Sequence, residues 1–228
     1  MHHAYRVIQS GDSRSFPGEH PFLGLSLSLS LSNADAQATA VVYTGAGSGA
    51  AFAAAPAAPD AAFVAIELGN ECLGLHTGEP HDGAATNVVG FARFRLGDGE
   101  PSALVELVRL DSTSAEALAA ARQAFEAAGL VVAVCNDFPG RIVNRLVRPY
   151  YNDALRRLDE QLATAEDMDM TLRLGLGYPE GPIALLRRTG LAQHYEVSQA
   201  LYVALGQEPY APARAAQVAH GRKTGVDA

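Results

Sequence analysis

A glycine-rich turn between two apolar runs is the first pattern in this sequence that could support chemistry. Gly45-x-Gly47-x-x-Ala50 follows the apolar run Ala40–Thr44, and Glu67 ends the next apolar run 22 residues after Gly45. In a dinucleotide fingerprint, such glycines let a pyrophosphate meet a helix N-terminus while the acidic residue holds a ribose. The pattern therefore makes Gly45, Gly47 and Glu67 candidate cofactor-binding residues. The alternative is a plain glycine turn in an abbreviated α/β sheet, because two prolines between residues 50 and 60 leave room for about two helical turns.

Other reactive residue types form weaker patterns. His76 and His81 flank a polar loop with Asp82, but histidines in such a loop are usually solvated, and no third metal ligand is evident. Cys72 and Cys135 form neither a CxxC pair nor a disulfide framework. The sequence contains no GxSxG, P-loop or HExxH motif. We therefore expect no metal centre.

The elements that would position these residues change in type near residue 136. Before it, alternating or short apolar runs predict strands, while residues 1–22 are expected to form an irregular arm. The expected strands are Leu25–Ser32, Ala40–Thr44, Ala61–Leu68, Cys72–His76, Val88–Leu96, Ala103–Leu110 and Leu130–Cys135. A helix is expected between a capping box at Thr113–Glu116 and the stop at Gly129.

Beyond Asp137 the spacing of apolar residues predicts helix almost throughout. Apolar residues recur at every fourth position from Ile142 to Leu162, which predicts one long amphipathic helix, and Pro149 predicts a kink in it. Thr164 is expected to begin a shorter helix that ends at Gly175. Gly190 is expected to separate two further helices. Residues 1–136 and 137–228 are thus the two expected domains.

Composition restricts the class of protein. The chain has 228 residues, and its 48% hydrophobic and 18% charged residues exclude global disorder. The formal charge of −8 argues against nonspecific nucleic-acid binding, which needs clustered Lys and Arg. No apolar run reaches the roughly 18 residues of a membrane span, and the first residues lack signal-peptide order. We expect a cytoplasmic protein with no nucleic-acid or membrane partner.

Three stretches of the second half resemble one known family, the 3-hydroxyacyl-CoA dehydrogenases. Residues 137–146, Asp-Phe-Pro-Gly-Arg-Ile-Val-Asn-Arg-Leu, resemble the family segment D-x-P-G-F-I-V-N-R-L that opens its helical domain. Residues 163–169 and 174–182 are similar to A-T-P-E-D-I-D and L-G-x-G-Y-P-M-G-P, and residues 221–225 to G-R-K-T-G. The order and spacing cover most of residues 103–225, about half the chain. Residues 39–136 also resemble the shortened second half of tandem long-form members.

The resemblance implies a reaction and some of its residues. The family oxidises a 3-hydroxyacyl-CoA with NAD, using a His as general base, a Glu that orients it, and substrate contacts from Ser and Asn. Glu106, within Leu104–Val108, matches the orienting Glu, and Asn144 matches the substrate-side Asn 38 residues later. No histidine occurs between Asp82 and Tyr178, where the family's H-F-F-N-P should lie. Without the family, Glu106 is an outward-facing strand residue and Asn144 a helix-surface or capping residue.

We expect an abbreviated, degenerate Rossmann-like α/β domain followed by a helical domain like the C-terminal domain of 6-phosphogluconate dehydrogenase. The resemblance implies a homodimer formed by the helical domain, with the apolar seam from Ile142 to Leu162 and Leu185, Leu191 and Leu201 as its surface. Two functions stay open. The chain is either an NAD-dependent dehydrogenase acting on an acyl-CoA, with an incomplete catalytic set, or a non-catalytic dimerisation or acyl-CoA-binding module derived from that family.

Overall fold

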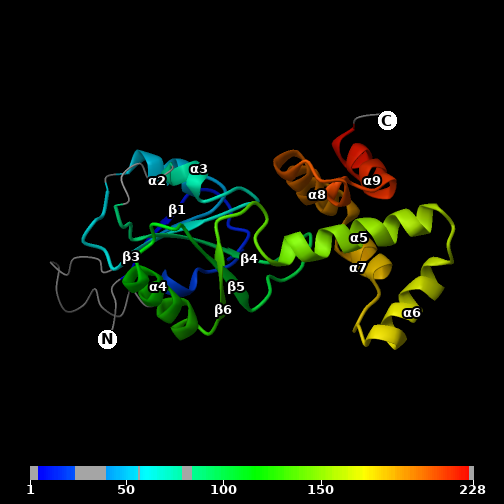
Figure 1. Cartoon of the computed structure of the whole chain (residues 1–228), viewed down its shortest axis with the longest axis horizontal. Helices are drawn as coiled ribbons and strands as arrows, with labels where there is room; N and C mark the ends of the chain where they lie inside the picture. The colour runs from blue at the N-terminus through cyan, green and yellow to red at the C-terminus, as the bar shows by residue number, and fades with distance from the viewer. Residues whose placement is uncertain (1–4, 24–39, 56, 79–83, 226–228) are drawn as a thin grey trace. The chain divides into compact units, whose positions relative to one another are not determined.

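The computed structural model describes residues 5–23, 40–55, 57–78 and 84–225, which fall into two compact units (Figure 1). The α/β unit comprises Met1–Phe94 and Pro101–Arg141, and the helical unit comprises Arg95–Glu100 and Ile142–Ala228. The expected change from α/β structure to helix is therefore present. The division falls after Arg141 rather than after residue 136, and the segment Arg95–Glu100 belongs with the helices.

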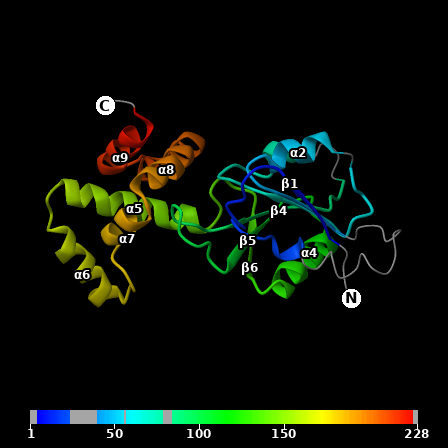
Figure 2. The same ribbon diagram turned by 180° about the vertical axis from the view of Figure 1, so that it is seen from behind.

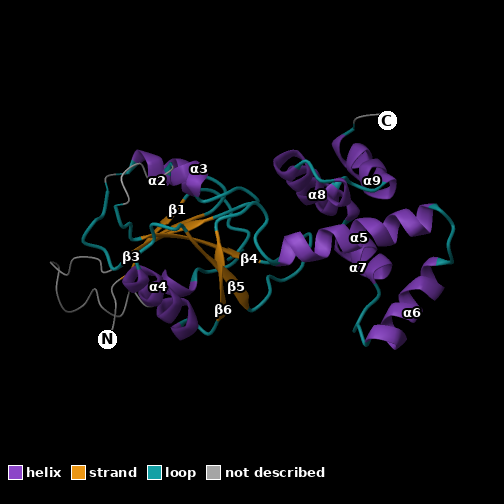
Figure 3. Cartoon of the chain, in the orientation of Figure 1, coloured by secondary structure: helices purple, strands orange, loops and turns teal. Residues whose placement is uncertain are grey.

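The described residues of the α/β unit form a six-stranded sheet (Figure 3). Its strands follow one another across the sheet in chain order, and all neighbours are parallel except β4 and β5. The strands are β1 (Tyr5–Gln9), β2 (Ala40–Thr44), β3 (Phe63–Glu67), β4 (Val88–Arg93), β5 (Leu104–Arg109) and β6 (Val131–Asn136). The predicted strands at 40–44, 61–68, 88–96, 103–110 and 130–135 are confirmed, with ends that differ by up to three residues.

Helices cover both faces of this sheet (Figures 1 and 2). The helices α2 (Ser48–Ala54) and α3 (Gly74–Thr77) lie on one face, and α4 (Ala115–Ala127) lies on the other. Right-handed crossovers explain this arrangement, because β2, β3 and β4 step across the sheet in one direction and place their connections on one face. Strand β5 runs the opposite way, so its crossover to β6 lies on the opposite face.

Alternation along the strands builds two cores. In β2, Ala40 and Val42 belong to the core beneath α4, whereas Val41 and Tyr43 belong to the core beneath α2 and α3. Strands buried on both faces are nearly continuous apolar runs, which is how β2 and β3 occur in the sequence. The predicted helix before Gly129 is confirmed as α4, which begins at the Ser114 cap.

Three sequence predictions in the first half need correction or fall outside the described residues. The described part of the expected irregular arm, residues 5–22, is not irregular, because β1 pairs with β2 and Phe16 and Phe22 are buried beneath α4. The strand β1 is short, and the glycines and prolines that follow it closely in the sequence favour an irregular segment instead. Cys72–His76 is not a strand but contains the start of α3. The predicted strand Leu25–Ser32 lies outside the described residues.

The helical unit contains five α-helices and one short 3-10 helix in its described residues. They are α5 (Val143–Asp159), α6 (Ala165–Leu176), α7 (Pro182–Thr189), α8 (Leu191–Leu205), η1 (Glu208–Tyr210) and α9 (Arg214–Thr224). Thr164 caps α6 and Gly190 separates α7 from α8, as the sequence predicted. Helix α5 contains Pro149 but ends at Asp159, before Leu162 of the predicted seam, and the kink at Pro149 stays a prediction. Helix α6 continues one residue past Gly175 to Leu176 and ends at Gly177 in the left-handed conformation.

No helix in the described ranges is long and apolar enough to cross a membrane. The cytoplasmic location expected from the sequence stays a prediction.

Candidate active site

Glu106 lies in the middle of β5 and is buried, with 1% of its surface exposed. The outward-facing alternative for this residue is therefore wrong. The antiparallel register places Ala92 of β4 directly opposite Glu106. Directly opposed residues of antiparallel strands project to the same face, with Cβ atoms roughly 5 Å apart. The position that faces the Glu106 carboxylate across the sheet thus carries a methyl group.

The cationic side chain next to Glu106 is Arg141, which the sequence analysis did not select. Its Nε lies 3.9 Å from Glu106 Oε2, and both side chains are almost fully buried. This distance is a charge–charge contact rather than a hydrogen bond. The guanidinium also donates through Nη2 to the carbonyl oxygen of Gly69. Arg141 stands where the family segment D-x-P-G-F-I-V-N-R-L has Phe, so a cation here replaces an apolar ring.

A tight turn after β6 holds Arg141 in this place. Gly140 and Arg141 both have positive φ, 73° and 53°, and a non-glycine residue seldom adopts this conformation. The Gly140 amide donates to the carbonyl of Asn70 at 2.9 Å. At the start of the turn, both carboxylate oxygens of Asp137 accept backbone amides of Leu73 and Gly74, at 2.6 and 2.8 Å, where α3 begins. The turn is therefore fixed to the end of the sheet at several points.

Burial affects the ionisable groups around this pair. Loss of water lowers the pKa of Arg141, while the carboxylates of Glu106 and Glu71 act in the opposite direction. Arginine stays protonated in proteins even so. Burial first, and then the charge of Glu106, raises the pKa of the Cys135 thiol to about 11. A raised pKa disfavours the thiolate, which is the nucleophilic form of cysteine.

Asn144 belongs to the helical unit, whereas Glu106 belongs to the α/β unit, so each is described within its own unit. Asn144 is the second residue of α5 and is half-buried. Its Oδ1 accepts a hydrogen bond from Nε of Arg148 one turn later, at 2.9 Å. The side chain is therefore held by a specific partner, unlike a mobile helix-surface residue.

The candidate cofactor residues are held by partners within the chain. Glu67 is buried, and its two oxygens accept hydrogen bonds from Ser13 Oγ, Ser15 N, Thr44 Oγ1 and Gly45 N at 2.6 to 2.9 Å. Its pKa is lowered, because these hydrogen bonds outweigh the effect of burial, which alone would raise it. A ribose would have to displace at least one of these donors.

The glycine turn itself is closed by the segment that follows β1. The amides of Gly45, Ala46 and Gly47 already donate to Glu67 Oε2, to Asp12 O at 3.0 Å and to Ser10 O at 2.8 Å. A Cβ on Gly45 would overlap the carbonyl oxygens of Ser10 and Gly11. Glycine is needed here because another part of the backbone approaches, so these residues do not fit a pyrophosphate.

The charges beside the glycine turn and the strand order of the sheet also argue against a dinucleotide site here. A cleft of about 190 Å³ beside the turn is lined by the carboxylates of Asp12, Glu67 and Glu71 and by Arg14. This lining is mainly acidic, and ligand pockets usually measure about 300 to 1,000 Å³. In addition, the described strands keep sequence order across the sheet, so they lack the reversal of strand order at which doubly wound sheets bind nucleotides.

The two described histidines of the α/β unit, His20 and His76, contact groups other than Glu106. His76 Nε2 lies 3.3 Å from Glu71 Oε1. His81 and Asp82, the other members of the candidate metal loop, lie outside the described residues. His20 packs against Phe16 and Phe22, and burial lowers its pKa to about 4.

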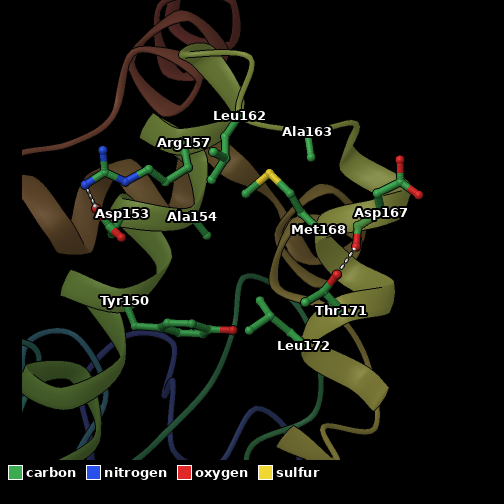
Figure 4. A pocket seen from close by; sticks show the side chains of 10 residues that line it. All are labelled: Tyr150, Asp153, Ala154, Arg157, Leu162, Ala163, Asp167, Met168, Thr171 and Leu172. Atoms are coloured by element: carbon green, nitrogen blue, oxygen red, sulfur yellow. Dashed lines mark hydrogen bonds and ion pairs between the residues drawn. The ribbon is translucent and has the colours of Figure 1, made fainter. Parts of the chain in front are cut away.

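A groove of about 320 Å³ runs between α5 and α6 within the helical unit (Figure 4). Tyr150, Leu162, Met168 and Leu172 line it with apolar surface, and Asp153, Arg157 and Asp167 lie among the residues around it. A second apolar cavity of about 380 Å³ shares Tyr150 and is lined by Tyr151, Tyr178 and Leu185. The helical unit thus has two apolar hollows that share Tyr150 in their lining.

Comparison with known proteins identifies relatives of the second half. The family described as 3-hydroxyacyl-CoA dehydrogenase, C-terminal domain, matches residues 140–226. A probable 3-hydroxybutyryl-CoA dehydrogenase of Deinococcus radiodurans is 34% identical over 109 residues, which are 48% of this chain and 39% of that protein. The 3-hydroxyadipyl-CoA dehydrogenase of Escherichia coli is 38% identical over 105 residues, 46% of this chain and 22% of that protein. The chain thus spans well under half the length of these relatives.

A solved structure extends the likeness to the α/β unit. The 3-hydroxybutyryl-CoA dehydrogenase from Escherichia coli superimposes with a TM-score of 0.67 and 26% identity, covering 80% of this chain and 39% of that one. The expected Rossmann-like fold followed by a helical domain is confirmed, as is the family resemblance read from the sequence.

The geometry around Glu106 allows an imidazole–carboxylate pair to be rebuilt. In the double variant Ala92→His and Arg141→Phe, the new imidazole should lie beside Glu106 in place of the guanidinium. A neighbouring carboxylate raises the pKa of an imidazole by about one unit or more. We expect NMR titration to give the new His a higher pKa than in the triple variant that also carries Glu106→Gln. Equal pKa values in two folded variants would show that residue 92 does not face Glu106.

Proposed function

Because residues 140–226 belong to the C-terminal domain family of 3-hydroxyacyl-CoA dehydrogenases, we propose that this chain binds an acyl-CoA thioester but does not itself transfer hydride. The observation that carries the proposal is the pair Glu106–Arg141 with Ala92 opposite. Oxidation of a 3-hydroxyl group needs a base that takes the hydroxyl proton. An imidazole can do this near neutral pH, whereas a guanidinium has no lone pair to accept a proton.

Binding of an acyl-CoA is supported by what the helical unit retains. The relatives are named for 3-hydroxybutyryl-CoA and 3-hydroxyadipyl-CoA, both of them acyl-CoA thioesters. Asn144 stands at the family's substrate-side position and has an ordered side chain. An amide nitrogen suits the carbonyl oxygen of a thioester or of a 3-keto group, which only accepts hydrogen bonds.

NAD is the cofactor that the family resemblance implies. The turn Gly45–Gly49 does not fit its pyrophosphate, because the backbone amides at residues 45–47 donate to acceptors of the chain itself. No step is therefore assigned to NAD on this chain. We therefore propose that this chain is a non-catalytic acyl-CoA-binding module that acts beside a separately encoded catalytic chain.

A second candidate function is the complete dehydrogenase reaction. Retention of Glu106 and Asn144 at the family's spacing favours it, together with the names of the relatives. It requires a dinucleotide site and a base other than those considered above, and Glu106 would have to take part in turnover.

Titration of the purified chain separates these two functions. We expect acetoacetyl-CoA to bind in calorimetry and Asn144→Ala to weaken binding about tenfold, the effect of losing one hydrogen bond worth about 1.4 kcal/mol. The control Asn136→Ala, an exposed Asn of the α/β unit, should bind as the parent does. NADH fluorescence should not change, and NADH should not be oxidised. NADH turnover that disappears in Glu106→Gln would establish the second function, and absence of acetoacetyl-CoA binding would refute the first.

We also propose that the helical unit pairs with a second copy of itself. Helix α6 buries little within its own unit, since Ala165 is its one buried residue, all of α6 being described. Leu162 lines the apolar groove of Figure 4 and is 69% exposed, and Leu174 and Leu176 near the end of α6 are 81% and 62% exposed. Leu162 thus adds exposed apolar surface to an apolar groove, and large exposed apolar patches are typical of interfaces. The expected seam needs one correction, because Leu201 is fully buried in its own unit and cannot contact a partner.

Substitution on α6 tests this pairing. Leu174→Asp places a charge in the apolar surface and should convert a dimer into a monomer in light scattering coupled to size exclusion. Leu75→Asp is the matched control, because Leu75 is 73% exposed but belongs to the α/β unit. A monomeric parent chain, or a Leu174→Asp variant that stays dimeric, would contradict the proposal.

A further inference from the structure

Four polar side chains are buried together in the helical unit, where α5 packs against α8. Arg148 and Asn152 lie one turn apart on α5, and His194 and Ser198 lie one turn apart on α8. All four are at most 2% exposed. A buried arginine is costly unless its charge and donors are matched, so the contacts of Arg148 define what this cluster does.

The hydrogen bonds of the cluster have only one consistent direction. Arg148 Nη1 lies 2.9 Å from His194 Nδ1, and a guanidinium can only donate, so Nδ1 accepts. The imidazole then carries its hydrogen on Nε2, which lies 2.9 Å from Asn152 Oδ1. Asn152 Nδ2 in turn donates to the carbonyl of Pro209 at 3.1 Å. The imidazole is therefore neutral and held in one tautomer.

This direction excludes a hydrolase-like role for the neighbouring serine. Ser198 Oγ lies 3.4 Å from His194 Nε2. Nε2 already bears a hydrogen, so it cannot take the proton of Ser198. Burial, followed by the charge of Arg148, lowers the pKa of His194 to about 3, which keeps the ring neutral at physiological pH. The unprotonated Nδ1 of His194, which accepts the hydrogen bond from Arg148, is thus present throughout the neutral pH range.

The other end of the Arg148 guanidinium reaches Asn144. Its Nε donates to Asn144 at 2.9 Å, and because arginine cannot accept, the amide oxygen rather than the nitrogen must face it. The amide nitrogen of Asn144 consequently points away from Arg148, with both hydrogens available as donors. Asn144 is half-buried, whereas Arg148 and His194 are fully buried behind it.

We infer that Arg148, held in place by His194, is a positioning residue that presents the amide N–H groups of Asn144 to a ligand oxygen. The ligand class is one that accepts at this point, such as the carbonyl oxygen of an acyl thioester. The inference rests on the proposed acyl-CoA binding and adds to it the reason why Asn144 donates rather than accepts. Neither Arg148 nor His194 itself touches the ligand.

Arg148→Met tests this role, because it keeps a long side chain but removes the donor to Asn144. We expect about tenfold weaker acetoacetyl-CoA binding in Arg148→Met and in Asn144→Ala. The double variant should bind no more weakly than Asn144→Ala alone, since Arg148 acts through Asn144. Arg157→Met is the matched control on the same helix, because Arg157 is exposed and pairs with Asp153 and Glu160. It should bind as the parent does.

A spectroscopic measurement on the same variants separates positioning from a purely structural effect. The side-chain amide of Asn144 has one nitrogen and two hydrogens, so it gives a pair of ¹H–¹⁵N correlations at one ¹⁵N shift. Relaxation of this pair should be that of a rigid group in the parent and that of a mobile group in Arg148→Met. If Arg148→Met folds and binds like the parent, or if its loss of affinity adds in full to that of Asn144→Ala, the inference is wrong. If the parent chain binds no acetoacetyl-CoA, the proposed function is wrong. If the Asn144 amide is as rigid in Arg148→Met as in the parent, the positioning role of Arg148 is wrong, whatever the binding result.

Discussion

A buried carboxylate with a buried counter-charge is the constraint on which the α/β unit depends. Glu106 lies in the middle of β5 with almost no exposed surface, and an isolated charge there would cost several kcal/mol. Arg141 supplies the opposite charge from a turn whose left-handed residues are tied to Asn70 and, through Asp137, to the start of α3. The sheet, the turn and α3 are thus joined around one ion pair. The same guanidinium lies beside Glu106, where an imidazole would have to lie if Glu106 were to orient a base.

Both units therefore use a buried arginine, but to different ends. Arg141 neutralises a carboxylate, whereas Arg148 is held by a neutral His and fixes an amide. In the function proposed for this chain, the guanidinium of Arg141 lies beside Glu106, where oxidation of an alcohol would need a proton acceptor. In the proposed positioning role, Arg148 holds the amide of Asn144 so that its nitrogen can donate to a ligand oxygen. A guanidinium beside Glu106 and a hydrogen-bonded Asn144 are together what we expect of a chain that binds an acyl-CoA without oxidising it.

Many of the helices and strands could be predicted from the sequence, because the spacing of apolar residues and the capping residues act over only a few positions. Strand β2, helix α4 and the glycine that separates α7 from α8 were predicted in this way. Strand β1 was missed because its five residues precede a run of turn formers, and its stability comes from pairing with β2. Arg141 was missed because the residues around it match a family segment, and its partner Glu106 is 35 residues distant in sequence. The glycines at 45 and 47 match a fingerprint locally, but the backbone at Ser10 and Gly11, which lies against them, is only brought there by β1.

A double-mutant cycle on Glu106 and Arg141, followed by urea unfolding, tests the central claim most directly. Arg141→Met removes the buried positive charge that lies 3.9 Å from Glu106 and should cost about 3 to 5 kcal/mol. Glu106→Gln removes the negative charge of the same pair and should have a cost of similar size. The double variant removes both charges, so its loss of stability should be much smaller than the sum of the two single losses. Losses that add within about 0.5 kcal/mol would mean that the two charges do not interact, and the claim that Arg141 holds Glu106 in place of an imidazole would be wrong.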